Sequence, residues 1–196
     1  MAGLVLASGS EARARLLAQA GVPFVACPSK LDEDSLRTAM KKEGASPAQM
    51  AERLAEVKAL SHSAADTFVI GADQILECDG ERFDKASSRD EALEALRFLR
   101  GRTHSLHTAV CVAQNGVVVW GALSSPRLHM RAFSDAFLED YVRRAGDAVE
   151  TSVGAYEYEG LGAQLFQSVE GDYFSVLGLP LLPLLDFLRR ASVLET

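Results

Sequence analysis

An Asn-Gly pair at residues 115–116 constrains the fold of this chain more than any other feature. Apolar and β-branched residues flank the pair on both sides, over residues 104–113 and 117–120. Asn-Gly favours a two-residue turn with positive φ at both positions, so the flanking runs are predicted to pair as an antiparallel hairpin. Residues 128–133 are predicted to form a third strand, and a helix with a serine cap is expected over residues 134–144.

The first part of the chain has a different pattern, in which strands and helices alternate. Residues 3–7 are apolar and lead through the small-residue turn at 8–10 into a helix that Ser10 can cap. A second apolar run, residues 67–70, is predicted to be a buried strand that ends near Asp73. Alternating strands and helices are typical of parallel sheets, whereas a hairpin is antiparallel. We therefore expect an α/β fold with a mixed sheet flanked by helices.

Three further helices have recognisable start or stop signals. Ser46, Pro47 and Gln49 occupy the N-cap, first and third positions of a capping box. Another helix is predicted over residues 88–101, and a last one over residues 181–191. We expect one domain over the 196 residues, and two lobes around a cleft are compatible with this order of elements.

Charge and composition exclude several classes of protein. The chain has 20 Lys and Arg against 27 Asp and Glu, a net charge of −7, which argues against broad binding of duplex nucleic acid or membranes. A local basic pocket for a phosphorylated small molecule is still allowed. Cys27, Cys78 and Cys111 form no CxxC pair, so we expect buried free thiols in a cytoplasmic protein.

Asp73 is the strongest single candidate for chemistry. It follows a buried run, where a carboxylate is costly unless it is paired, ligates a metal or is catalytic; the alternative is a carboxylate that caps the next turn. Arg13 lies one turn into the first helix, and it is either a phosphate ligand beside the small-residue turn or a solvated charge. Taken alone, Lys58 and Lys85 are typical of surface lysines.

Two other polar groups are ambiguous. Glu33 lies in an acidic run at residues 31–34, which is typical of a solvated loop, although clustered carboxylates also suit a divalent cation such as Mg²⁺. His104 and His107 are three apart on a predicted strand, so they point to opposite faces and are interpreted as structural.

Short motifs along nearly the whole chain, in the same order, resemble those of the Maf family of nucleoside triphosphate pyrophosphatases. One such motif alone would be weak, but their joint occurrence in order is specific. They are residues 6–13 (LASGSEAR) with Leu16 and Leu17, Glu33, residues 56–59 (EVKA), residues 71–73 (GAD), Lys85, residues 101–104 (GRTH), residues 154–160 (GAYEYEG) and residues 178–180 (GLP).

The resemblance implies a cytoplasmic enzyme with a Maf/ITPase-like α/β fold, elongated around a cleft. Such an enzyme hydrolyses the bond between the α and β phosphates of a nucleotide, gives a monophosphate and pyrophosphate, and removes non-standard or excess nucleotides. It uses a divalent metal, Mg²⁺ or Mn²⁺, and is commonly a homodimer. By resemblance, Asp73 aligns with the proposed catalytic base of the family. The phosphate-binding positions of the family correspond to Ser8, Ser10, Arg13, Lys58 and Lys85. The carboxylates that hold the metal correspond to Glu33 and Asp73.

Three departures bear on specificity. Most family members read Ser-Pro-Arg-Arg where this chain has Ser10-Glu11-Ala12-Arg13, so contacts from position 12 are lost. The family's Lys-Pro is Lys85-Ala86 here. Gln74 and Glu159 stand where the branch that prefers dTTP and UTP has Thr and Gln, and they resemble the branch that prefers 7-methyl-GTP.

A carboxylate at position 159 can accept hydrogen bonds from guanine N1–H and its amino group, which uracil and thymine do not offer. Alternatively, Glu159 is only a polar residue of a glycine-rich loop. Two other functions remain open: a dTTP/UTP pyrophosphatase, and a nucleotide-binding regulator of septum formation without catalysis.

Overall fold

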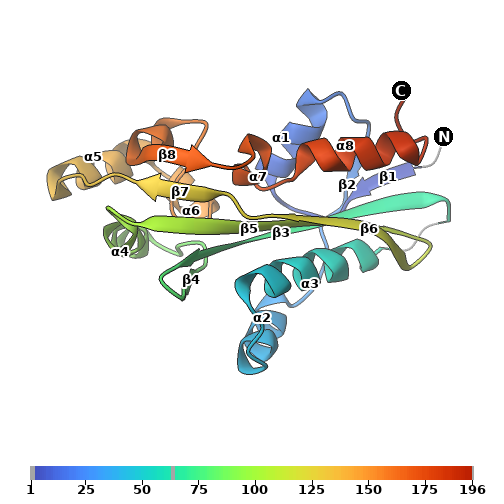
Figure 1. Ribbon diagram of the computed structural model, residues 1–196, viewed down its shortest axis with the longest axis horizontal. Helices are drawn as coiled ribbons and strands as arrows, with labels where there is room; N and C mark the ends of the chain where they lie inside the picture. The colour runs from blue at the N-terminus through green and yellow to red at the C-terminus, as the bar shows by residue number, and fades with distance from the viewer. Residues whose placement is uncertain (1–2, 63–64, 196) are drawn as a thin grey trace. The chain divides into compact units, whose positions relative to one another are not determined.

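The structure is a computed structural model that describes residues 3–62 and 65–195 (Figure 1). The described residues form one eight-stranded mixed sheet flanked by helices, which confirms the predicted α/β class. The strands are β1 (Gly3–Leu6), β2 (Val25–Ala26), β3 (Thr67–Cys78), β4 (Glu81–Phe83), β5 (Thr103–Gln114), β6 (Val117–Ser124), β7 (Arg127–Met130) and β8 (Phe166–Glu170). The helices are α1 (Glu11–Gln19), α2 (Glu33–Lys42), α3 (Pro47–Leu60), α4 (Arg89–Leu99), α5 (Asp135–Ala145), α6 (Ala148–Thr151), the 3₁₀ helix η1 (Leu161–Leu165), α7 (Tyr173–Val176) and α8 (Leu181–Arg190).

The strand order is β2-β1-β3-β5-β7-β8, with β4 paired to β3 and β6 paired to β5. Strand β1 is parallel to β2 and β3, whereas the β3–β4, β5–β6, β5–β7 and β7–β8 pairs are antiparallel. The predicted hairpin is confirmed: Asn115 and Gly116 have φ of 52° and 75° and join Gln114 to Val117, which are paired across the ladder.

The chain divides into two compact units, and each is described by itself. The first unit lies within residues 1–74, 108–124 and 172–196, and the second within residues 75–107 and 125–171. Strands β3 and β5 run through both units. The expected cleft between two lobes stays a prediction.

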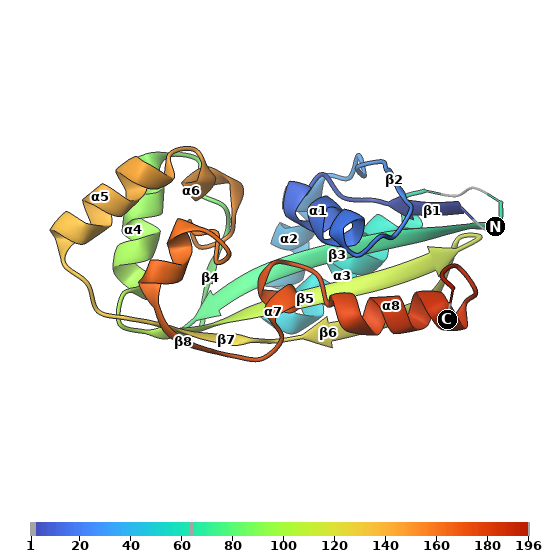
Figure 2. The same cartoon turned by 90° about the horizontal axis from the view of Figure 1, so that it is seen from above.

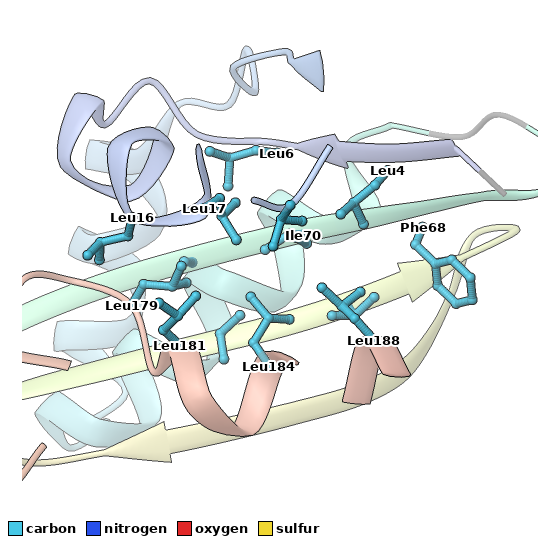
Figure 3. Packing of buried hydrophobic residues seen from close by; sticks show 14 residues of the cluster. Leu4, Leu6, Leu16, Leu17, Phe68, Ile70, Leu179, Leu181, Leu184 and Leu188 are labelled. Atoms are coloured by element: carbon cyan, nitrogen blue, oxygen red, sulfur yellow. The ribbon is translucent and has the colours of Figure 1, made fainter. Parts of the chain in front are cut away.

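One face of the first unit's strands is covered by α1 and α8, and the other face by α3 (Figure 1). The core on the first of these faces is mostly aliphatic, with the Phe68 ring among its members (Figure 3), and each fully buried side chain of this size contributes roughly 1.5–3 kcal/mol. Its buried members come from β1, α1, β3, β5 and α8, and include Leu4, Leu6, Leu16, Leu17, Phe68, Ile70, Val110, Val112, Leu184 and Leu188.

The opposite face of β3 carries an unusually close helix contact. A Cβ atom built on Gly71 would lie 2.1 Å from the carbonyl oxygen of Ala55 and 2.4 Å from the backbone nitrogen of Ala59, both in α3. Only a residue without a side chain therefore lets the helix lie directly on the strand. Successive side chains of a strand alternate between faces, so Asp73 points to the same side as Gly71, toward α3.

Helix α3 begins as its sequence predicts. Ser46 accepts from the backbone N–H of Gln49, the Gln49 side chain accepts from the backbone N–H of Ser46, and Pro47 is the first helical residue. Lys58, which taken alone is typical of a surface lysine, lies on the buried side of this helix. The buried side consists of Met50, Ala51, Leu54, Ala55, Lys58 and Ala59, so Lys58 is 6% exposed and is not a surface lysine.

Three predicted element boundaries are wrong. Strand β3 continues to Cys78, so Asp73 lies within the strand and not at its end, because apolar residues beyond Gln74 keep pairing. Only the first half of the acidic run at residues 31–34 lies outside a helix, since Asp32 caps α2 and Glu33 is its first residue. Strand β7 ends at Met130, and residues 131–133 leave the sheet.

In the second unit, α4, α5 and α6 pack against one another (Figure 2). One strand residue of the second unit, His104 in β5, is a buried histidine. His104 is 1% exposed, and its Nε2 lies 2.6 Å from the Tyr156 hydroxyl. Its Nδ1 has no hydrogen-bond partner among the described residues. Burial lowers the pKa of His104 from 6.5 to about 4, with a smaller contribution from His129, so the ring is neutral in the folded protein.

This buried ring predicts acid sensitivity. Below pH 6.5 the unfolded chain protonates His104 and the folded chain does not, so the free energy of unfolding falls as pH drops from 6.5 toward 4, by about 3 kcal/mol. His104→Gln is expected to remove this part of the pH dependence. Urea denaturation of both proteins between pH 7 and pH 4 measures it, and parallel stability profiles would contradict the expectation.

The cysteine prediction is correct for two of three residues. Cys78 and Cys111 are buried, and burial raises the pKa of the Cys111 thiol to about 11. Cys27 is exposed, because it follows the short edge strand β2, and its Sγ lies 3.0 Å from His62 Nε2. Within residues 3–62 and 65–195, no helix has the length and apolarity needed to span a membrane.

Candidate active site

The turn between β1 and α1 is held by its serines and by Arg13. Ser10 is the N-cap of α1, and its side chain accepts from the Arg13 backbone N–H at 3.4 Å. Ser8 is buried, and its Oγ accepts from the Ser10 backbone N–H and from Arg13 Nη1, both at 3.2 Å. The start of α1 thus combines a helix N-terminus with a buried cation, which is the arrangement that binds anions in many proteins.

Arg13 is buried, with 9% of its surface exposed, so the solvated alternative is wrong. Its Nε donates to the carbonyl oxygen of Gly178 at 2.8 Å, which fixes the guanidinium beside the turn. Burial lowers the pKa of Arg13, and the negative charges of Asp73 and Glu33 oppose that shift.

A buried ion pair joins α3 to β3. Lys58 Nζ lies 2.7 Å from Asp73 Oδ1, and Asp73 is 3% exposed. The close approach of α3 at Gly71 sets this distance, because Lys58 and Asp73 come from the same helix–strand contact. Asp73 is therefore a buried, paired carboxylate. The alternative, in which Asp73 caps the following turn, is wrong.

Helix α2 adds two more charges to this pair. Glu33 Oε2 lies 2.9 Å from Lys58 Nζ, and Arg37 Nη2 lies 3.3 and 3.1 Å from the two oxygens of Asp73. Arg37 Nη2 is also 3.7 Å from Glu33 Oε2, one helical turn away. The four side chains alternate in charge, and we call them the charge cluster: Glu33, Arg37, Lys58 and Asp73.

The two carboxylates of the charge cluster fit a hard divalent cation. Glu33 and Asp73 both contact one lysine nitrogen, so they are close enough to face a common point. In the part of the chain that the structure describes, no group of three or more His, Cys, Asp or Glu side chains could hold a metal. Mg²⁺ is commonly held by one or two carboxylates together with water and substrate phosphates, and such a site requires no more protein ligands than these.

Gln74 faces away from the charge cluster. Its Nε2 donates to Thr108 Oγ1 at 2.8 Å and approaches the carbonyl oxygens of Ser175 and Val176 at 3.0 and 3.2 Å. Asp73 and Gln74 are neighbours on a strand and point to opposite sides. In this structure Gln74 joins β3 to β5 and α7, and a role in base selection stays a prediction.

The remaining predicted site residues are less buried. Ala12 is partly buried in the first turn of α1. Lys85 and Glu159 belong to the second unit, where both are exposed and Lys85 forms an isolated β-bridge with Val153. Their phosphate and base contacts stay predictions from resemblance.

A model of the Maf-like protein family matches residues 3–191. The chain belongs to the Maf family. A relative from Paramagnetospirillum magneticum is 51% identical over 188 residues, which cover 95% of this chain and 97% of the relative. A relative from Rhodospirillum rubrum is 50% identical over 193 residues, covering 97% and 96% of the two chains, and both relatives carry the name nucleoside triphosphate pyrophosphatase.

In this Maf protein, the charge cluster contains one residue that the sequence argument missed. Arg37 lies in none of the quoted motifs, and no helix was predicted between residues 31 and 42. Two signals were present: Asp32 as an N-cap, and a spacing of four residues from Glu33 to Arg37, which brings them together on a helix.

Proposed function

We propose that this chain is a hydrolase of phosphoanhydrides that acts on nucleoside triphosphates and releases a nucleoside monophosphate and pyrophosphate. The observation that carries the proposal is the buried Asp73, which is paired with both Lys58 and Arg37. A carboxylate among several cations suits a reaction in which a water must lose a proton beside a polyanion. The name shared by the close relatives supports the same activity.

Each side chain has a distinct role in this proposal. The Ser8–Ser10 turn and Arg13 bind phosphate oxygens, with Lys58 and Lys85 as further cations. Asp73 accepts the proton of the attacking water, or holds the metal together with Glu33. Bound Mg²⁺ or Mn²⁺ would supply charge neutralisation on the phosphates.

A coupled assay tests the activity. Purified protein is incubated with nucleoside triphosphates, with and without Mg²⁺, and phosphate is measured after addition of inorganic pyrophosphatase. We expect phosphate that depends on both the metal and the added pyrophosphatase. A nucleotide-induced rise in melting temperature without any product would contradict the enzyme and support the nucleotide-binding regulator.

We further propose that the preferred substrate is 7-methyl-GTP or another modified guanine nucleotide, read by Glu159. Glu159→Gln is expected to lower kcat/KM for 7-methyl-GTP by about tenfold, because an amide replaces a charged acceptor, with a smaller change for UTP. Glu157→Gln is the matched control, since Glu157 is an exposed carboxylate of the same loop. Highest efficiency of the wild-type protein on dTTP or UTP would reverse this assignment.

The family resemblance also implies a cytoplasmic location and a homodimer. Light scattering of the purified protein tests the dimer, and a monomer at micromolar concentration would contradict it.

A further inference from the structure

Both oxygens of Asp73 are in contact with cations. Lys58 Nζ lies 2.7 Å from Oδ1, and a single Arg37 nitrogen, Nη2, lies 3.3 Å from Oδ1 and 3.1 Å from Oδ2. Oδ2, the oxygen that Lys58 leaves open, therefore faces Arg37. A water or a metal must compete with these cations for the lone pairs of the carboxylate, so Asp73 becomes more accessible if one cation moves.

The two cations differ in how firmly they are held. Lys58 is 6% exposed, comes from the helix that Gly71 holds against β3, and has the shorter contact with Asp73. The Arg37 side chain is 22% exposed, comes from the separate helix α2, and has the longer contacts. A longer and more exposed ion pair exchanges its partners more readily, because water screens it and replaces it.

Electrostatic attraction favours transfer of the displaced Arg37 guanidinium to the phosphates of the substrate. Glu33 and Asp73 would hold a divalent cation, whose charge would repel Arg37 and compete for its two carboxylate partners in the charge cluster. A triphosphate brings new anionic oxygens to the same place, and guanidinium groups bind phosphate with two parallel hydrogen bonds.

We propose that Arg37 covers Asp73 while the site is empty and transfers to the triphosphate when metal and nucleotide bind. Arg37 then competes with the metal in the free enzyme and adds a further phosphate contact in the complex. This inference rests on the proposed function, because it requires a triphosphate as substrate.

For Arg37→Ala, the proposal predicts tighter binding of the metal but weaker binding of the triphosphate. Isothermal titration calorimetry of Mn²⁺ into nucleotide-free protein should show binding at least about threefold tighter than in the wild type, because a positive charge next to Asp73 is gone. At saturating metal, KM for the triphosphate should rise about tenfold, because a charge-assisted hydrogen bond to phosphate is lost.

Matched variants separate this role from a general charge effect. Lys42→Ala removes one positive charge from an exposed position of the same helix, five residues beyond Arg37 and off the face that carries Glu33 and Arg37. It should leave both quantities within about twofold of the wild type. Arg37→Gln replaces the guanidinium by a shorter, neutral amide that keeps a polar side chain on α2 but no charge, and it should repeat both effects of Arg37→Ala. Thermal unfolding of each variant confirms that α2 is intact.

Unchanged or weaker Mn²⁺ binding in both Arg37 variants would overturn the inference, as would an unchanged KM. These outcomes differ from failure of the proposed function. In that case the wild-type protein itself would release no pyrophosphate, whereas here it is active and only the variants lack the two shifts.

Discussion

Asp73→Asn is expected to lower kcat for pyrophosphate release by about a thousandfold, within the range observed when a general acid–base group is removed. The amide has the size of the carboxylate but can neither take up the proton of a water nor supply a negative charge to a metal. The fold should persist, since the amide oxygen still accepts from Lys58 and Glu33 remains 2.9 Å from the same nitrogen. Stopped or quenched assays of pyrophosphate release measure kcat directly.

Asp186→Asn is the control for this substitution. Asp186 is an exposed carboxylate of α8 that pairs with Arg190 on the same helix, so its neutralisation should leave kcat unchanged. Near-normal turnover in Asp73→Asn would exclude Asp73 as the catalytic group, even if the protein proves to be a pyrophosphatase.

Gly71→Ala is expected to have the largest effect on stability. Its Cβ would lie 2.1 Å from one backbone atom of α3 and 2.4 Å from another, and rigid backbone cannot yield as a flexible side chain does. The helix must move off β3, at a cost of about 3 kcal/mol or more. Because the same contact sets the Lys58–Asp73 distance, the folded fraction should also lose activity.

A second strand glycine provides the comparison. A Cβ on Gly121, in β6, would have its nearest neighbour, the carbonyl oxygen of Val110, at 3.4 Å, which is an ordinary contact. Gly121→Ala should therefore change the free energy of unfolding by less than about 1 kcal/mol. Chemical denaturation of both variants tests the difference, and equal stabilities would show that α3 is not held by the absence of a side chain at Gly71.

Local signals in the sequence predict much of this fold. The turn at Asn115-Gly116, the cap at Ser46 and the serine-rich start of α1 are each fixed by chemistry within a few residues. The phosphate-binding interpretation of Arg13 also depends on neighbours close in sequence, and the structure places Arg13 against Ser8.

Contacts between distant segments were harder to predict. Taken alone, Lys58 is typical of a surface lysine, and only its packing against β3 shows that it is buried beside Asp73. Gly71 resembles the end of a strand, but it marks a close helix approach within a strand that continues. Such features depend on which element lies opposite, and that information is not local.

Helix α2 is an intermediate case. Its acidic start and its two final lysines fit the dipole of a helix, so the local signal existed, but the acidic residues also suit a solvated loop. Arg37 could be recognised only after the helix was known, because the helical spacing brings it to Glu33 and the fold brings both to Asp73.

The most direct test of the central claim is ³¹P NMR of the products that the wild-type protein forms from a nucleoside triphosphate and Mg²⁺. The account predicts resonances of nucleoside monophosphate and pyrophosphate in equal amounts, and their loss in Asp73→Asn. Formation of nucleoside diphosphate and orthophosphate, or unchanged triphosphate after prolonged incubation, would contradict it.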